Sequence, residues 1–202
     1  MTGPRDASGE VPCPGCGRRY PAARFEGGRT LHCTCGARVG RAPPPPPPLA
    51  GAPRFAADAM LGRLALWLRL LGFDTFYEAD VDDAALARRA LDEQRTLLTR
   101  DRALLEAWTL PDAYLVAAED SQAQLQEVAR HFQLAAHAQP FSRCSRCNAP
   151  LEPTSLDAVR TRIPPRVAAT HVAFLRCPAC RRIYWEGTHV ARMRQVLEEA
   201  LH

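Results

Sequence analysis

Eight cysteines fall into two sets of four, one near each end of this chain of 202 residues, and they constrain its fold more than any other feature. In the second set, 29 residues separate the pair Cys144-x2-Cys147 from the pair Cys177-x2-Cys180. Two such tight turns deliver four sulfurs to one tetrahedral zinc ion. Four cysteine ligands leave no open position, so the spacing predicts a structural zinc site, with a redox or disulfide role as the alternative.

The first set follows a similar pattern with a shorter second pair. It comprises Cys13-x2-Cys16 and Cys33-x-Cys35, and glycines beside the cysteines supply the freedom that tight turns need. His32 could replace one sulfur, although four cysteines are the preferred ligand set. A module of about thirty residues cannot bury enough apolar surface to fold alone. We therefore expect a second structural zinc ion here, whose binding holds the module together.

The composition favours a cytoplasmic protein without a membrane partner. Hydrophobic residues make up 47% of the chain, which suffices for an ordinary core. The most apolar stretch, residues 60–73, is interrupted by Arg63 and Arg69, and residues 1–10 carry no apolar signal core. Closely paired cysteines in a reducing compartment indicate metal ligands before disulfides.

All 26 basic residues are arginines, and charge is unevenly distributed along the chain. Residues 54–140 contain nine arginines and fourteen acids, which gives a net charge of −5. Residues 141–194 contain ten arginines and three acids, which gives +7. An acidic middle suits a cation site, and basic flanks suit a polyanion. The alternative is a chance distribution over solvated faces.

A proline run marks the main boundary of the chain. Six prolines occupy residues 43–48 and predict an extended polyproline spacer. We therefore expect four parts: an N-terminal zinc ribbon (1–40), a proline-rich linker (41–53), a sheet domain (54–140), and a C-terminal zinc ribbon with a terminal helix (141–202).

Strand and helix patterns alternate in the expected sheet domain. Strands are expected at residues 54–57, 74–77, 96–99 and 113–117, and helices at residues 59–71, 83–93, 101–108, 121–132 and, at the end of the chain, 190–201. The first helix should bury one apolar stripe: Met60, Leu61, Leu64, Leu68 and Leu71. This order predicts an α/β fold with a parallel sheet flanked by helices and a zinc ribbon at each end of the chain.

Three aspartates stand at the starts of expected helices: Asp58, Asp83 and Asp101. The carboxyl ends of parallel strands border the crevice in which such sheets place their sites. Carboxylates meeting there would repel one another unless divalent cations lay between them, and Mg²⁺ and Mn²⁺ favour oxygen ligands. The arrangement predicts metal-assisted hydrolysis of phosphodiester bonds. The alternative is that each aspartate only caps its helix.

Several separated motifs together resemble one known family. They are Phe55-Ala-Ala-Asp-Ala-Met-Leu-Gly-Arg-Leu-Ala65, Trp67-Leu-Arg-Leu-Leu-Gly-Phe-Asp74, Leu97-Leu-Thr-Arg-Asp-Arg102, Gln124-Leu125 ahead of Val128, the first cysteine pair of the second set, Ile163-Pro-Pro-Arg166, Cys177-Pro-Ala-Cys180 and Ile183-Tyr-Trp-Glu-Gly-Thr-His189. Over about residues 54–194 the chain resembles the Mut-seven C-terminal ribonuclease domain family, a PIN-like group. The resemblance implies a PIN-like sheet fused to a zinc ribbon, and a ribonuclease activity. The N-terminal ribbon lies outside it.

Carried over position by position, the resemblance implies a metal site built from three acids: Asp58, Asp83 and Asp101. Asp80 and Asp82 are rivals of Asp83. PIN-like proteins often have a fourth acid, for which Asp120 is the candidate and Glu119 the alternative.

Four arginines flank the aspartates along the sequence: Arg63, Arg69, Arg100 and Arg102. Arg63 and Arg102 are the candidates for binding a scissile phosphate, because a planar guanidinium matches phosphate oxygens. The chain departs from the family at Leu66, where a basic residue is expected. Trp67 is expected to be a core residue and not a platform for a base.

The sequence thus predicts a metal-dependent ribonuclease that cuts RNA, in single-stranded form, with Mg²⁺ or Mn²⁺ in the aspartate site and two structural zinc ions. The zinc ribbons are expected to aid nucleic-acid binding. One alternative is a non-catalytic adaptor that binds nucleic acid or protein. Another is the toxin of a toxin–antitoxin pair. The sequence leaves open the RNA target, the preference for RNA over DNA, and any protein partner.

Overall fold

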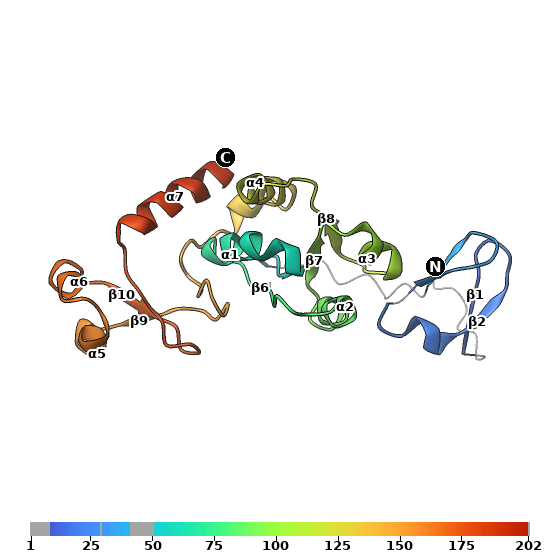
Figure 1. Ribbon diagram of the computed structural model, residues 1–202, viewed down its shortest axis with the longest axis horizontal. Helices are drawn as coiled ribbons and strands as arrows, with labels where there is room; N and C mark the ends of the chain where they lie inside the picture. The colour runs from blue at the N-terminus through green and yellow to red at the C-terminus, as the bar shows by residue number, and fades with distance from the viewer. Residues whose placement is uncertain (1–8, 29, 41–50, 202) are drawn as a thin grey trace.

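The computed structural model describes residues 9–28, 30–40 and 51–201, and it places the two cysteine modules at opposite ends of an elongated molecule (Figure 1). The sheet domain lies between them. The expected polyproline spacer at residues 43–48 lies outside the described residues.

Four parallel strands form the central sheet. They are β5 (Phe55–Ala57), β6 (Thr75–Phe76), β7 (Thr96–Thr99) and β8 (Ala113–Leu115). Their order across the sheet is β6-β5-β7-β8, and each neighbouring pair is parallel. The chain leaves β5 toward one side of the sheet and later leaves β7 toward the other, as in a doubly wound sheet. The predicted α/β fold is confirmed.

Helices cover both faces of this sheet. They are α1 (Gly62–Leu70), α2 (Asp83–Asp92), α3 (Arg102–Ala107) and α4 (Ser121–His131). Phe55, Ala57 and Leu98 pack on one face with α1 and α4, whereas Ala56 and Leu97 pack on the other face with α2 and α3. Successive strand residues point to opposite faces, and both faces are buried. The short strands are therefore continuously apolar.

The first helix departs from its expected pattern at its start. A 3-10 turn, η2 (Ala59–Leu61), precedes α1. The four leucines of the expected stripe are fully buried, but Met60 is 58% exposed. The prediction for Met60 was wrong because a 3-10 turn places side chains at a different angular spacing from an α-helix. Trp67 packs partly against the core, as expected.

The N-terminal ribbon consists of two antiparallel hairpins. Its elements are β1 (Glu10–Pro12), β2 (Arg19–Pro21), η1 (Ala22–Gly28), β3 (Thr30–His32) and β4 (Arg38–Gly40). Phe25 and Val39 form a small core with Cys13 and Cys33. The η1 segment lies against α2, and β3 lies against α3.

The C-terminal ribbon contains a three-stranded antiparallel sheet with a helical insert. Its elements are β9 (Glu152–Thr154), α5 (Leu156–Val159), η4 (Arg160–Arg162), α6 (Pro165–Thr170), β10 (Phe174–Arg176) and β11 (Ile183–Tyr184). Val159, Ile163 and Phe174 form its core, and Trp185 packs against them.

The last helix, α7 (Thr188–Leu201), follows the C-terminal ribbon in sequence but packs on the sheet domain. Leu197 and Ala200 belong to the same buried cluster as the core residues of α1 and α4, and Figure 1 shows α7 beside α4. None of the helices in the described part of the chain is long and apolar enough to cross a membrane.

Candidate active site and metal centres

Two of the predicted aspartates leave neighbouring strands at the same edge of the sheet. Asp58 directly follows β5, and Asp101 lies two residues beyond β7. These central strands are adjacent, and the connections that follow them run to opposite sides of the sheet. The carboxyl ends of such a pair border a crevice. The structure therefore brings Asp58 and Asp101 to the edge at which the sequence predicts a site.

Thr99, the last residue of β7, links these two aspartates. Its Oγ1 donates to Oδ2 of Asp58 (2.5 Å) and accepts a hydrogen bond from the backbone N–H of Asp101 (2.9 Å). Asp58 and Thr99 are both buried, and a buried carboxylate costs free energy unless it is hydrogen-bonded. The sequence predicts Thr99 only as the last residue of a strand. The sequence feature that could have predicted these hydrogen bonds is a hydroxyl-bearing residue at the end of the strand that precedes Asp101.

Asp83 reaches the site from α2, and its role in that helix differs from the expected one. The residue that caps the helix is Asp82, whose Oδ1 accepts a hydrogen bond from the backbone N–H of Ala85 (2.8 Å). Asp83 is the first helical residue, so the alternative that it only caps the helix is wrong. Because its neighbour satisfies the helix end, the Asp83 carboxylate is left for another partner.

The three carboxylates share one electrostatic environment. Burial raises the pKa of Asp83, and the negative charges of Asp58 and Asp101 raise it further. Within the described part of the chain, none of the three forms an ion pair with an arginine. They are also more widely spaced than the cysteines: among the described residues, only the two cysteine sets bring three or more ligand atoms within 4.8 Å of one another. The site is an open acidic cluster.

The two candidates for a fourth acid differ in their contacts. Asp120 caps α4, and its Oδ1 accepts hydrogen bonds of 2.8 and 3.2 Å from two backbone N–H groups of the first turn. These bonds lower the pKa of Asp120, and the positive charge of Arg63 contributes to the same shift. The carboxylate of Glu119 instead lies 3.5 Å from the guanidinium of Arg100.

The flanking arginines do not all belong to this site. Arg63 and Arg102 are exposed, whereas Arg69 is 6% exposed and contacts the second cysteine set. Arg69 follows Asp58 closely in sequence, but α1 carries it away from the acids by about 1.5 Å per residue. Leu66, which replaces the basic residue expected from the resemblance, is 41% exposed and lies on the surface of α1.

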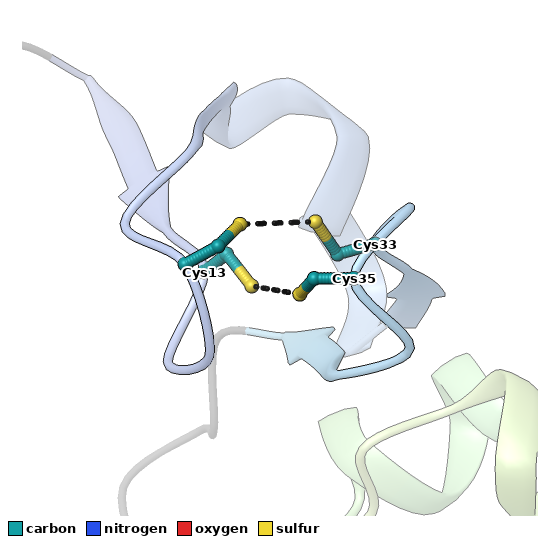
Figure 2. Close-up of side chains that lie close together, drawn as sticks. Cys13, Cys33 and Cys35 are labelled. Atoms are coloured by element: carbon teal, nitrogen blue, oxygen red, sulfur yellow. Dashed lines mark hydrogen bonds between the residues drawn. The ribbon is translucent and has the colours of Figure 1, made fainter.

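Both cysteine sets bring their sulfurs together, and Figure 2 shows how those of the first set face one another. The facing sulfurs are 3.5 Å apart in both pairs of the first set, and 3.6 and 3.3 Å apart in the second. A tetrahedral zinc ion with Zn–S distances of about 2.3 Å needs sulfurs about 3.8 Å apart. All eight cysteines are free thiols, so both sets fit structural zinc. His32 is exposed and belongs to neither ligand group.

Each cysteine pair is followed by a residue in the left-handed backbone region. The φ values are 74° for Gly17, 85° for Gly36, 68° for Asn148 and 60° for Arg181. In each case the backbone N–H of this residue donates to the carbonyl of the first cysteine of the pair, at 2.8 to 3.0 Å. The Cys33 turn is one residue shorter than the other three, but all four end in a left-handed residue, a conformation that glycine and asparagine adopt at least cost.

The fold and these sites agree with a comparison against known families. The model of the family described as Mut7-C RNAse domain matches residues 53–197. The chain belongs to the Mut7-C family. The matched range contains the aspartates and the second cysteine set, but the first cysteine module lies outside it. The family is ribonuclease-like by its description. No curated protein and no solved structure matched the chain.

In this Mut7-C domain, two side chains of α4 hold the loop that leads to Asp120. Nε2 of Gln124 donates to the carbonyl oxygens of Ala118 and Glu119, each at 3.1 Å. The carboxylate of Glu127 accepts two backbone N–H bonds from the same loop, at 2.9 and 2.8 Å. Burial acts to raise the pKa of Glu127, but these bonds outweigh it and lower the pKa. No motif in the sequence predicts this role for Glu127.

The turn after Asp58 of the Mut7-C domain is held in one conformation. The backbone N–H of Asp58 donates to the neighbouring strand (3.0 Å), and the hydroxyl of Tyr77 donates to the carbonyl of Ala59 (3.2 Å). Gly62 is required here, because a Cβ atom would lie 2.5 Å from the Tyr77 hydroxyl. The turn therefore holds Met60 in its exposed position two residues from a site aspartate.

Proposed function

We propose that this chain is a ribonuclease that hydrolyses RNA phosphodiester bonds by means of divalent ions, Mg²⁺ or Mn²⁺, held by Asp58, Asp83 and Asp101. The observation that carries the proposal is the placement of Asp58 and Asp101 after adjacent parallel strands, with Asp83 beside them, whose pKa is raised by burial and by the charges of the other two. None of the described arginines forms an ion pair with Asp58, Asp83 or Asp101. The match to a family described as an RNAse domain supports the reaction class.

The donor set fits a hard cation. Carboxylate oxygens are the ligands that Mg²⁺ and Mn²⁺ prefer, and a bound cation would relieve the repulsion among the three acids. The carboxylates are spread more widely than the cysteine sulfurs. Sites with two ions, about 3.5–4 Å apart, use such a spread of ligands.

In three of the acids, one carboxylate oxygen accepts hydrogen bonds from within the protein. The other oxygen of each is available to a ligand. Asp58 is bonded through Oδ2, and Asp101 is bonded through Oδ1 to the backbone N–H of Ala103 (2.7 Å). Asp120 is bonded through Oδ1 as well, and we include it as the fourth acid. Bound ions would supply an activated water and stabilise the leaving oxygen. The protein would hold the acids in place, with Thr99 orienting Asp58.

The exposed groups around the acids suit a single RNA strand. Arg63 and Arg102 would hold phosphates beside the scissile bond. Met60 offers an apolar contact to a base that is not paired with another strand. The net charge of +7 over residues 141–194 would attract more of the strand to the second ribbon.

The test is cleavage of a labelled single-stranded RNA by the purified protein, with Mg²⁺ or Mn²⁺ and with chelator. We expect Asp101→Asn to lower the rate at least about a hundredfold, because a neutral amide is a poor ligand for these ions. Asparagine also caps helices, so α3 keeps its start. The matched control is Asp92→Asn at the end of α2, which should cleave at the wild-type rate.

Binding of the same RNA separates the enzyme from the adaptor. Loss of cleavage in Asp101→Asn with unchanged RNA binding supports the proposal. If wild type and variant show the same trace activity, the cleavage comes from a contaminant. The chain would then be a non-catalytic binding module.

A further inference from the structure

A buried arginine joins the second cysteine set to the sheet domain. Nη1 of Arg69 donates to the carbonyl oxygens of Arg146 (2.8 Å) and Ser145 (3.3 Å), the two residues between the first two cysteines of this set. Its Nε donates to the carbonyl of Thr75, the first residue of β6 (2.9 Å). One guanidinium therefore connects the cysteine turn, the helix α1 that carries it, and a strand of the sheet.

Asn148, directly after the same turn, makes a second link. Its Nδ2 donates to Oδ1 of Asp74 (2.6 Å), and its Oδ1 accepts a hydrogen bond from the backbone N–H of Thr75 (3.0 Å). Arg95 also bonds the Asp74 carboxylate (2.7 Å). Burial alone would raise the pKa of Asp74, but the hydrogen bonds from Arg95 and Asn148 lower it to about 2. The side chain of the cysteine turn thus completes a partly buried charge network.

We propose that zinc bound by Cys144, Cys147, Cys177 and Cys180 is a structural part of the sheet domain, and that Arg69 and Asn148 transmit its presence to α1 and β6. Both residues contact the short turn formed by Cys144 and Cys147. The shape of this turn would depend on the two thiolates binding the same zinc ion. Four thiolates with one zinc ion carry a net charge of about −2, and a guanidinium held against the turn balances part of it. Groups outside the ligands commonly fix metal sites in this way.

This link lies at the edge of the sheet opposite the aspartates. Asp74 and Arg95 precede β6 and β7, whereas Asp58 and Asp101 follow their strands. At about 3.3 Å per strand residue, the two edges are roughly 10 Å apart. Arg69 is therefore a positioning residue that holds α1 and β6 against the cysteine turn. The inference holds whether or not the chain cleaves RNA.

The experiment measures zinc binding at each site separately in the full chain. The zinc-loaded protein is equilibrated in buffers of decreasing free zinc and treated with iodoacetamide, and the cysteine peptides are quantified by mass spectrometry. In Arg69→Met, we expect Cys144 and Cys147 to become alkylated at a free zinc concentration about 10–100-fold higher than in wild type. The midpoint for Cys13 and Cys16 should stay unchanged.

Arg146→Met is the matched control. It removes a positive charge from the same turn but leaves the carbonyl that Arg69 binds, so its midpoint should move by less than about threefold. Arg69→Lys, which keeps the charge and loses the fork geometry, should fall between wild type and Arg69→Met. An unchanged midpoint for Cys144 in a folded Arg69→Met protein would overturn the proposal.

A second variant and a second readout cover the case in which Arg69→Met does not fold. Asn148→Gly keeps the left-handed turn and removes both side-chain bonds, and it should raise the second-site midpoint by at least about threefold. In wild type, withdrawal of zinc should speed amide hydrogen exchange in α1 and β6 at least about tenfold, since linkage is reciprocal. The proposal is overturned if Asn148→Gly binds zinc as wild type does, or if zinc withdrawal does not change the amide exchange rates of α1 and β6. The second site would then be an independent module.

Discussion

The two cysteine modules share a ligand set and differ in their attachment to the sheet domain. The second is joined through a buried arginine and through Asn148, which binds the end of a sheet strand. The first rests on the outside of α2 and α3, and an exposed hydrogen bond runs from Oγ1 of Thr30 to the carbonyl of Glu106 (2.6 Å). The same four-cysteine ligand set can therefore occur in a module attached to the outside of a domain and in a module integrated with that domain.

Part of this difference arises from the residue that follows the cysteines. Each turn needs a left-handed residue, and the first module uses glycine at both positions, Gly17 and Gly36. Glycine satisfies the backbone and offers no side chain. Asn148 satisfies the same backbone requirement and also sends an amide group to Asp74 and Thr75. A single choice at an equivalent position therefore gives one turn a contact that the others lack.

The largest expected effect comes from removing the second metal site. Cys144→Ser with Cys147→Ser should abolish the cooperative thermal unfolding of the sheet domain, and with it RNA cleavage. Zinc binding by such sites is worth about 10–16 kcal/mol, which is comparable to the total stability of a domain, about 5–15 kcal/mol. Far-UV circular dichroism against temperature and the cleavage assay measure the two effects.

The matched pair in the first module is Cys13→Ser with Cys16→Ser. It should leave the unfolding transition of the sheet domain within a few degrees of wild type, because the described residues of the first module form a core of their own and do not belong to the buried clusters of the sheet domain. If both double variants destabilise the sheet domain to the same extent, the two modules do not differ in their attachment to it.

The same contrast shows what sequence could predict. The strands and helices of the sheet domain follow from local patterns, so their ranges were predicted to within a few residues. The placement of Asp58 and Asp101 follows from strand order, since parallel strands end at one edge. The destination of Arg69 was missed because its partners are backbone carbonyls some seventy-six residues away, which have no side-chain signature. The cap at Asp82 was missed because three nearby aspartates, at positions 80, 82 and 83, suit a helix start equally well.

A smaller effect is expected from Asp74→Asn, which weakens the link of the second module. The variant should be less stable to unfolding by about 2 kcal/mol at pH 7, because the lowered pKa of Asp74, about 2, reflects a favourable interaction of the carboxylate in the folded state. Urea denaturation of both zinc-loaded proteins measures the difference.

The difference in stability between wild type and Asp74→Asn should depend on pH. A carboxylate with a lowered pKa contributes stability above the pKa of the unfolded state, about 3.9, and loses that contribution as pH falls toward 2. The stability difference between wild type and Asp74→Asn should therefore be constant from about pH 5 to 8 and shrink below about pH 4. A difference that grows on acidification would contradict the assigned role.

The smallest expected effect concerns the first module. Thr30→Val removes the hydroxyl that bonds Glu106 and keeps the side-chain shape, and it should lower the stability of the sheet domain by less than about 1 kcal/mol, because water can replace the bond. The comparison variant is Thr75→Val in β6, whose buried hydroxyl donates to the carbonyl of Phe73 (3.2 Å). It should cost about 1–3 kcal/mol, because it leaves a buried acceptor without its donor. Should Thr30→Val prove as costly as Thr75→Val, the exposed bond would couple the first module to the sheet domain as strongly as a buried bond acts within the sheet domain itself.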